Sequence, residues 1–169
     1  MSNKVYLLLG SNMGDRRNNL AVAAKKIAEK IGTPTICSSV YETQSWGYED
    51  DDYLNQVVAC DTEMPPLAVL TTIDVIEKSM GRIRYNTGYH ARTIDIDILF
   101  YNDIIINTPN LEIPHPKVHL RRFALTPMCE LAPKLIHPTL HKTMYQLLED
   151  CNDRGRVKLI EYIEKTTIQ

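Results

Sequence analysis

Residues 92–101 read Arg92-Thr93-Ile94-Asp95-Ile96-Asp97-Ile98-Leu99-Phe100-Tyr101, and this stretch decides the fold. Apolar and acidic residues alternate from Ile94 to Ile98, which is the period-two pattern of a half-buried strand. The isoleucines are therefore expected to face a core. Asp95 and Asp97 then point together to the opposite face, with Cα atoms roughly 6.5–7 Å apart because a strand rises ~3.3 Å per residue.

This aspartate pair predicts a cation site. Two carboxylates so close together repel each other unless a cation lies between them. Mg²⁺ takes oxygen ligands and is commonly held by one or two carboxylates plus substrate phosphates. Two metal ions about 3.5–4 Å apart would also fit between such side chains. A strand with a solvated acidic face explains Asp95 and Asp97 equally well at this stage.

Arginines near the pair favour the cation site. Arg82, Arg84 and Arg92 precede the strand by a few residues, and Arg121 and Arg122 follow it. Arg92 has the opposite parity to the aspartates, so we expect it in a loop that can turn toward the same face. Guanidinium groups bind phosphate oxygens through paired hydrogen bonds. The aspartate pair and the arginines together therefore indicate a binding site for a metal-bound polyphosphate.

The overall composition excludes several classes of protein. A chain of 169 residues with 44% hydrophobic and 24% charged residues suits one globular domain. A net charge of −2 argues against nucleic acid as the main partner. Four cysteines without a C-x-x-C pair argue against zinc and disulfides. Because we find neither a signal peptide nor a membrane span, we expect a cytoplasmic protein.

The chain before residue 92 alternates between strand and helix patterns. Residues 5–9 form an apolar strand that runs into a glycine turn at 10–14. A glycine turn between a strand and a helix can bind phosphate, but this one lacks the known phosphate-binding glycine patterns, so a plain turn is the favoured interpretation. Asp15 or Asn12 would cap the helix that follows, and Gly32 would end it. The apolar residues of this helix are Leu20, Ala24, Ile27 and Ile31.

A second pair of strands and a second helix follow. Residues 35–43 and 53–60 are rich in strand-forming residues, and a polar loop between them carries the single tryptophan. Prolines 65 and 66 open a helix that Gly81 ends. Its apolar stripe is predicted to be Leu67, Leu70, Ile73, Ile76 and Met80. Glu77 lies beside this stripe and would either pair with a nearby arginine or contact a ligand.

The remaining elements extend this core. We predict a strand at 104–106, an extended proline-rich stretch at 111–116, helices at 117–131 and 143–148, and a last strand at 157–160. The resulting β-α-β-β-α-β order is typical of an α+β, ferredoxin-like fold. We therefore expect an antiparallel sheet with helices on its outer face, followed by appended C-terminal helices and strands.

Several segments together resemble a known family, 6-hydroxymethyl-7,8-dihydropterin pyrophosphokinase. The resemblance covers residues 4 to about 140, in order and with similar spacing. The matching segments are Gly10-Ser11-Asn12-x-Gly14, Ser39-x-Tyr41-x-Thr43, Tyr53-Leu54-Asn55, Glu77-x-x-x-Gly81-Arg82-x-Arg84, residues 92–99, and Pro114-His115-Pro116 before Arg121-x-Phe123. Residues 1–169 would then be a single pyrophosphokinase domain.

The resemblance implies a folate-pathway enzyme that moves pyrophosphate from ATP to the pterin hydroxymethyl group and releases AMP. Asp95 and Asp97 match the ligands of two Mg²⁺ ions, and Arg82 and Arg92 complete the catalytic set. The ATP-binding positions would be Glu77, Arg84, Tyr89, Arg92, Ile98, His115 and Arg121. The pterin-binding positions would be Thr43, Gln44, Trp46, Tyr53, Asn55 and Phe123.

Two loops depart from the family pattern. Tyr89-His90-Ala91-Arg92 stands where the family usually has Trp-Gly-Pro-Arg, so the aromatic surface is smaller. Thr43-Gln44-Ser45-Trp46-Gly47 replaces Thr-Pro-Pro-x-Gly. Without prolines this loop has more conformations to lose on binding. We therefore expect it to order around ATP more slowly or at a higher free-energy cost.

Two other functions fit parts of the sequence. A Mg²⁺-dependent nucleotidyltransferase could also place Asp95 and Asp97 on such a sheet, but it would release free pyrophosphate. A ferredoxin-like RNA-binding module could use aromatic residues on a strand face, although the acidic pair opposes phosphate binding. We expect ATP and the pterin as the only partners, with no nucleic acid, no membrane and a monomeric state.

Overall fold

The computed structural model describes residues 2–33, 35–44, 52–81, 93–161 and 167–168. Its main sheet has seven strands in the order β5-β1-β4-β2-β9, and β3 joins β4 to β8. The strands are β1 (Asn3–Ser11), β2 (Thr35–Cys37), β3 (Val40–Thr43), β4 (Tyr53–Thr62), β5 (Asp95–Tyr101), β8 (Val157–Glu161) and β9 (Thr167–Ile168). All neighbouring strands are antiparallel. This arrangement confirms the predicted ferredoxin-like sheet.

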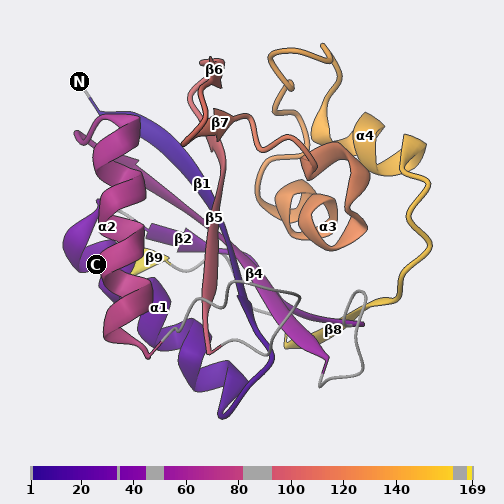
Figure 1. Cartoon of the computed structure of the whole chain (residues 1–169). Helices are drawn as coiled ribbons and strands as arrows, with labels where there is room; N and C mark the ends of the chain where they lie inside the picture. Colours follow the sequence, from indigo (N-terminus) through magenta and orange to yellow (C-terminus); the bar gives the residue numbers. More distant parts are fainter. Residues whose placement is uncertain (1, 34, 45–51, 82–92, 162–166, 169) are drawn as a thin grey trace.

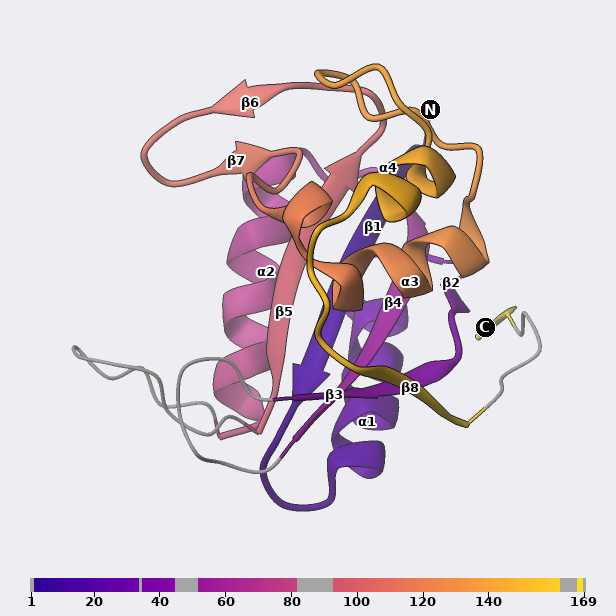
Figure 2. The same ribbon diagram turned by 90° about the vertical axis from the view of Figure 1, so that its right-hand side faces the viewer.

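Helices lie on both faces of the sheet. Helices α1 (Arg16–Lys30) and α2 (Pro66–Ser79) cover one face, and α3 (Arg122–Leu131) and α4 (Met144–Asp150) lie over the other (Figures 1 and 2). A 3₁₀ turn, η1 (Val118–Leu120), leads into α3, and β6 (Ile106–Asn107) pairs with β7 (Glu112–Ile113). Two separate hydrophobic clusters result, one on each face of the sheet.

The predicted strand over 35–43 is interrupted at Ser38 and Ser39, both fully buried. The Ser38 hydroxyl accepts a hydrogen bond from the Val57 N–H at 2.9 Å. The Ser39 N–H donates to the Glu130 carboxylate of α3 at 2.7 Å. Side chains thus replace part of the strand ladder here, which serine does readily. The result is two short strands, β2 and β3, along the same neighbour, β4.

The helix boundaries agree with the predicted caps. The Asp15 side chain accepts the Asn18 N–H at 3.1 Å and begins α1, so Asp15 is the cap and not Asn12. Gly32 follows α1 as predicted, but for a different reason. A Cβ there would collide with the Asp61 carbonyl oxygen. Gly81, with φ +84°, does adopt the left-handed conformation that ends α2.

Two details of the sequence-based prediction are wrong, one in a helix and one in a strand. Leu67 is 60% exposed, and Val69 takes its place in the core, because Val69, Ile73 and Ile76 share one helical face. Only the last residue of the predicted strand 104–106 is in a strand, since Ile106 is the first residue opposite β7. No helix in the described ranges is long and apolar enough to cross a membrane.

Candidate active site

One row of residues crosses four strands near the end of the sheet. Asp95 of β5 lies opposite Gly10 of β1, Gly10 lies opposite Asn55 of β4, and Asn55 lies opposite Tyr41 of β3. Neighbouring strands are about 4.8 Å apart. Asp95, from the predicted acid pair, and Asn55, a predicted pterin-binding residue, therefore lie at the same end of the sheet.

The same residues also share one face. Ile94, Ile96 and Ile98 are 0–5% exposed and pack in the cluster with α1 and α2. Asp95 and Asp97 alternate with them and are half-buried on the other face, the one that carries α3. This confirms the predicted orientation of the isoleucines and the aspartates.

Strand β4 repeats this division between faces. Leu54 packs with α1 and α2, whereas Val57 packs with α3 and α4. Tyr53 and Asn55 have the parity of Val57, so they face α3 together with the aspartates.

Gly10 lies between Asp95 on one neighbouring strand and Asn55 on the other, and its lack of a side chain leaves room above β1. A Cβ at Gly10 would lie 3.3 Å from Asn55 Oδ1 and 3.4 Å from Tyr53 Cδ1. The Asn55 amide and the Tyr53 ring thus lie directly over the backbone of β1. Asn55 also donates to the Thr43 hydroxyl at 2.6 Å, and both residues are 4% exposed. A buried amide and a flanking aromatic ring suit a flat, polar heterocycle.

The start of α3 supplies a second aromatic group and a cation. The Arg121 guanidinium lies 5.5 Å from the centre of the Phe123 ring, within the range of a cation–π contact. Farther along α3, the Glu130 carboxylate accepts hydrogen bonds from the Tyr41 hydroxyl and the Ser39 N–H, each at 2.7 Å. Glu130 therefore fastens α3 to β3, the strand that also carries Thr43.

His115 is held next to the acid pair as a neutral imidazole. Its backbone N–H donates to the Leu99 carbonyl at 3.0 Å, and its Nδ1 accepts the Lys117 N–H at 3.1 Å. Burial, together with the nearby charges of Arg121 and Lys117, lowers the pKa of His115 to about 4, and Asp95 opposes this shift. Because Nδ1 is an acceptor, the proton of the neutral ring is on Nε2. His115 can therefore donate a hydrogen bond to an anion without carrying charge.

His115 is expected to make the folded protein sensitive to acid. Its pKa is about 4 in the folded protein, whereas an exposed histidine has a pKa of 6.5, so the unfolded chain binds more protons between these pH values. The free energy of unfolding should then fall, by roughly 2–3 kcal/mol, as the pH drops through this window. Urea unfolding at a series of pH values measures this slope.

The control is His115→Asn, whose side-chain oxygen can still accept the Lys117 N–H but does not titrate. Burial lowers the pKa of His137 as well, so a smaller slope of the same sign should persist in the variant. Equal slopes in the variant and the wild type would contradict the assignment to His115.

Glu77 is nearly inaccessible, with 2% exposure, although it is an acidic residue. Its carboxylate accepts the N–H of Ile96 at 3.0 Å. Ile96 lies between the two aspartates on β5, which is the edge strand of the sheet. The described structure thus gives Glu77 a partner in the strand that carries the acid pair, and its contact with ATP stays a prediction.

The other predicted site residues have three outcomes. Ile98 is 5% exposed in the opposite hydrophobic cluster, so only its main chain is available on the aspartate face. Gln44 is exposed directly after β3. The predicted residues that lie outside the described ranges are Trp46, Arg82, Arg84, Tyr89 and Arg92.

The sequence suggested close approach at Gly10 but placed this glycine in a turn, whereas it lies inside β1 between Asp95 and Asn55. Its position between Asp95 and Asn55 depends on the register of β1 against β4 and β5, and this register cannot be predicted from local sequence periodicity.

The comparisons with known proteins identify the family of this chain. Residues 6–133 match the family model for 7,8-dihydro-6-hydroxymethylpterin-pyrophosphokinase (HPPK). The chain belongs to the HPPK family. The HPPK match includes the whole row from Gly10 to Asp95 as well as His115, Arg121 and Phe123. Residues after 133 lie beyond it.

Several HPPK relatives are similar over most of this chain. The 2-amino-4-hydroxy-6-hydroxymethyldihydropteridine pyrophosphokinase of Porphyromonas gingivalis is 41% identical over 138 residues, which are 79% of this chain and 93% of that protein. The Aquifex aeolicus enzyme of the same name is 41% identical over 83% of this chain and 87% of its own length. The folic acid synthesis protein FOL1 of Dictyostelium discoideum is 37% identical over 92% of this chain, which spans only 24% of that protein.

Solved structures show the same fold at lower sequence identity. Wild-type HPPK-DHPS of Plasmodium falciparum matches with a TM-score of 0.69 and 20% identity, over 88% of this chain and 43% of that one. Another HPPK-DHPS, solved in complex with substrates, matches with a TM-score of 0.70 and 18% identity over 89% of this chain and 43% of that one. The chain thus spans less than half the length of these two chains.

Proposed function

We propose that this chain transfers the pyrophosphoryl group of ATP to the hydroxymethyl group of 6-hydroxymethyl-7,8-dihydropterin, giving AMP and the pterin diphosphate for folate synthesis. One observation carries the proposal. Asp95 and Asn55 face the same side of the sheet on either side of Gly10, in one row. A phosphate site at Asp95 and a heterocycle site at Asn55 would then be adjacent, as direct transfer between two bound substrates requires.

The acid pair suits Mg²⁺. Asp95 and Asp97 are half-buried on one face of an edge strand. Within the described ranges no three His, Cys, Asp or Glu side chains come together around a metal position. The other ligands of a bound ion are proposed to be phosphate and water oxygens, which Mg²⁺ prefers. Two Mg²⁺ ions, when bound, would neutralise the phosphate charge and lower the pKa of the attacking hydroxyl.

The residues around the pair would bind and orient the polyphosphate. His115 would donate from Nε2 to a phosphate oxygen without adding charge, and Arg121 would neutralise charge as AMP leaves. Arg82, Arg84 and Arg92 are assigned to the same polyphosphate, and Tyr89 to the nucleotide, on the strength of the family resemblance alone. We nominate no general base for the hydroxyl, because positioning and charge neutralisation account for most of the catalysis of phosphoryl transfer.

The pterin would bind over β1 and β4. The Tyr53 and Phe123 rings would lie on its two faces, and Asn55, held by Thr43, would recognise its ring edge through amide hydrogen bonds. Gln44 and Trp46 would cover the site from the loop after β3. A monomeric state, a cytoplasmic location, a single domain and the absence of a nucleic-acid partner are proposed from the sequence.

The proposed function is tested by incubating the protein with ATP, Mg²⁺ and 6-hydroxymethyl-7,8-dihydropterin and separating the products. AMP and the pterin diphosphate in equal amounts are expected, and no product is expected when Mg²⁺ is chelated. Free pyrophosphate together with a nucleotidylated acceptor would instead support the nucleotidyltransferase. Filter binding of single-stranded RNA at low salt tests the RNA-binding alternative.

A further inference from the structure

The segment 151–161, which follows α4 and includes β8, crosses the face that carries the candidate site. Figure 2 shows it leaving α4, passing in front of α3 and entering β8 beside β3. It lies wholly beyond residue 133, where the HPPK match ends. Its contacts nevertheless reach both sides of the pterin pocket proposed above.

The first contact is at the start of α3. The Asp153 carboxylate accepts the Arg122 N–H through Oδ2 at 3.1 Å and the Gly155 N–H through Oδ1 at 2.8 Å. The cap residue of α3, Arg121, has no side-chain capping bond, so Asp153 supplies an acceptor from a distant part of the chain. A carboxylate at a helix N-terminus is also favourable for the helix dipole. Arg122 lies between Arg121 and Phe123, and Asp153 therefore fixes the turn that presents both.

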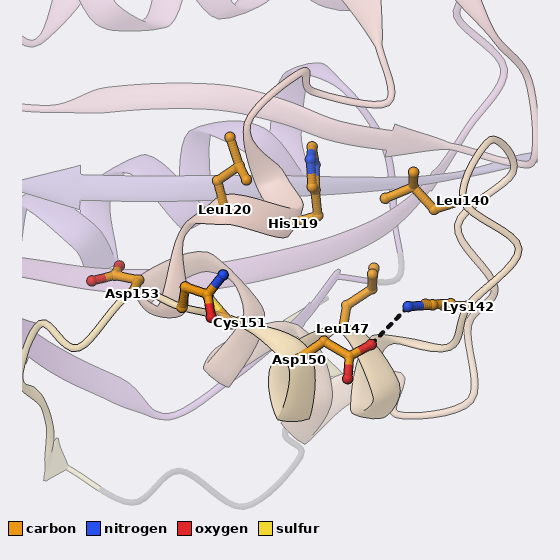
Figure 3. Close-up of a pocket in the computed structure, with 9 residues that line it drawn as sticks. His119, Leu120, Leu140, Lys142, Leu147, Asp150, Cys151 and Asp153 are labelled. Carbon is orange, nitrogen blue, oxygen red and sulfur yellow. Dashed lines mark hydrogen bonds and ion pairs between the residues drawn. The ribbon is translucent and has the colours of Figure 1, made fainter.

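The close-up in Figure 3 places this contact in its surroundings. Asp153 and Leu120 line one end of a cavity of about 350 Å³ between η1 and α4. The Lys142–Asp150 ion pair, at 2.8 Å, lies toward the other end. Beside this cavity, the hydrogen bond that the Arg122 N–H donates to Asp153 links the segment to the η1–α3 turn.

The second contact is at the start of β4. Arg156 donates to the Asp52 carboxylate at 3.2 Å, and the Asp52 carbonyl accepts from Arg16 of α1 at 2.7 Å. Asp52 directly precedes Tyr53. In addition, β8 pairs with β3 along its whole length, so that Thr43 lies opposite Val157. The segment therefore also holds the strands that carry Thr43 and Tyr53.

We propose that Asp153 and Arg156 are positioning residues that set the two sides of the pterin pocket relative to each other. Asp153 fixes the Phe123 side, Arg156 fixes the Tyr53 side, and only two residues of chain separate them. This inference rests on the proposed function. A flat ring between two aromatic groups is bound well only when their separation is right, and a shift of about 1 Å in a substrate-positioning group reduces function strongly.

The test measures the dissociation constant of the pterin in the presence of a non-hydrolysable ATP analogue and Mg²⁺. We expect Asp153→Ala and Arg156→Ala each to weaken pterin binding about five- to tenfold. Asp153→Asn, which keeps one side-chain carbonyl oxygen for the Arg122 N–H, should restore part of the loss. A general loss of stability would not be rescued in this way, and urea unfolding of each variant shows that the measured protein is folded.

Matched controls come from the same part of the chain. Asp150→Ala breaks the exposed ion pair with Lys142 without touching α3 or β3. Arg154 is exposed and makes no hydrogen bond or ion pair with the described part of the chain, so Arg154→Ala controls for the loss of positive charge. Both should bind the pterin within twofold of the wild type. If the wild type binds the pterin and the Asp153→Ala and Arg156→Ala variants bind it with the same affinity, this inference is wrong but the proposed function stands. If the wild type does not bind the pterin, the proposed function is wrong as well.

Discussion

Asp97→Ala is expected to lower kcat/KM for pyrophosphoryl transfer at least a thousandfold, or roughly 4 kcal/mol of transition-state stabilisation. Asp97 and Asp95 share the face that carries α3, and no third acidic, histidine or cysteine side chain joins them among the described residues. Asp97→Ala would thus remove one of the two carboxylates that are proposed to bind Mg²⁺. The Mg²⁺ concentration needed for half-maximal rate should rise sharply at the same time.

The loss should be specific to catalysis. Asp97 is on the half-buried face of β5, and the core side of the strand is made by its isoleucines, so the variant should fold. Asp103, exposed in the turn after β5, provides the control, and Asp103→Ala should keep full activity. Quantifying AMP and pterin diphosphate against Mg²⁺ concentration gives both numbers. Activity of Asp97→Ala within tenfold of the wild type would refute the metal-binding role.

The sequence predicts the central part of this site because the information there is local. Alternation over residues 94–98 is sufficient to place Asp95 and Asp97 on one face and the isoleucines on the other, and burial confirms it. The same alternation in the strand that begins at Tyr53 places Asn55 on the same face as Tyr53. Glycines and prolines similarly mark the ends of α1 and the start of α2.

What the sequence did not predict depends on contacts between distant segments. The break at Ser38 and Ser39 is stabilised by the Val57 N–H and by Glu130, 91 residues away from Ser39. The alignment of Asp95, Gly10 and Asn55 depends on the register of three strands, which no local period encodes. Segment 151–161 carried no motif, yet its hydrogen bonds reach both α3 and Asp52, the residue before β4. Such tertiary pairing is decided by packing of the whole chain.

Glu77 shows how such a contact can matter for the reaction. Its carboxylate is 2% exposed and accepts the Ile96 N–H on the outer edge of β5. In Glu77→Ala this N–H would lose its acceptor in a buried setting, which destabilises a protein by about 1–3 kcal/mol, and a cavity would form beside the edge strand. Ile96 links Asp95 to Asp97, so the carboxylate geometry would loosen with it. We expect kcat to fall about a hundredfold, as it does when a group that orients a metal ligand is removed.

Glu77→Gln separates the hydrogen bond from the charge. Glutamine keeps a side-chain oxygen that can accept the Ile96 N–H. We therefore expect Glu77→Gln to recover most of the stability and to have a kcat at least tenfold higher than that of Glu77→Ala. Lys78→Ala, one residue along on the exposed side of α2, should match the wild type in both. Measuring urea unfolding, kcat and the ATP dissociation constant for the three variants distinguishes the two roles of Glu77. A loss confined to ATP affinity, with the same value in the alanine and glutamine variants, would favour the nucleotide contact that the family resemblance implies. A loss of kcat that glutamine rescues would show that Glu77 acts through β5, by holding the strand that carries the two carboxylates proposed to bind Mg²⁺.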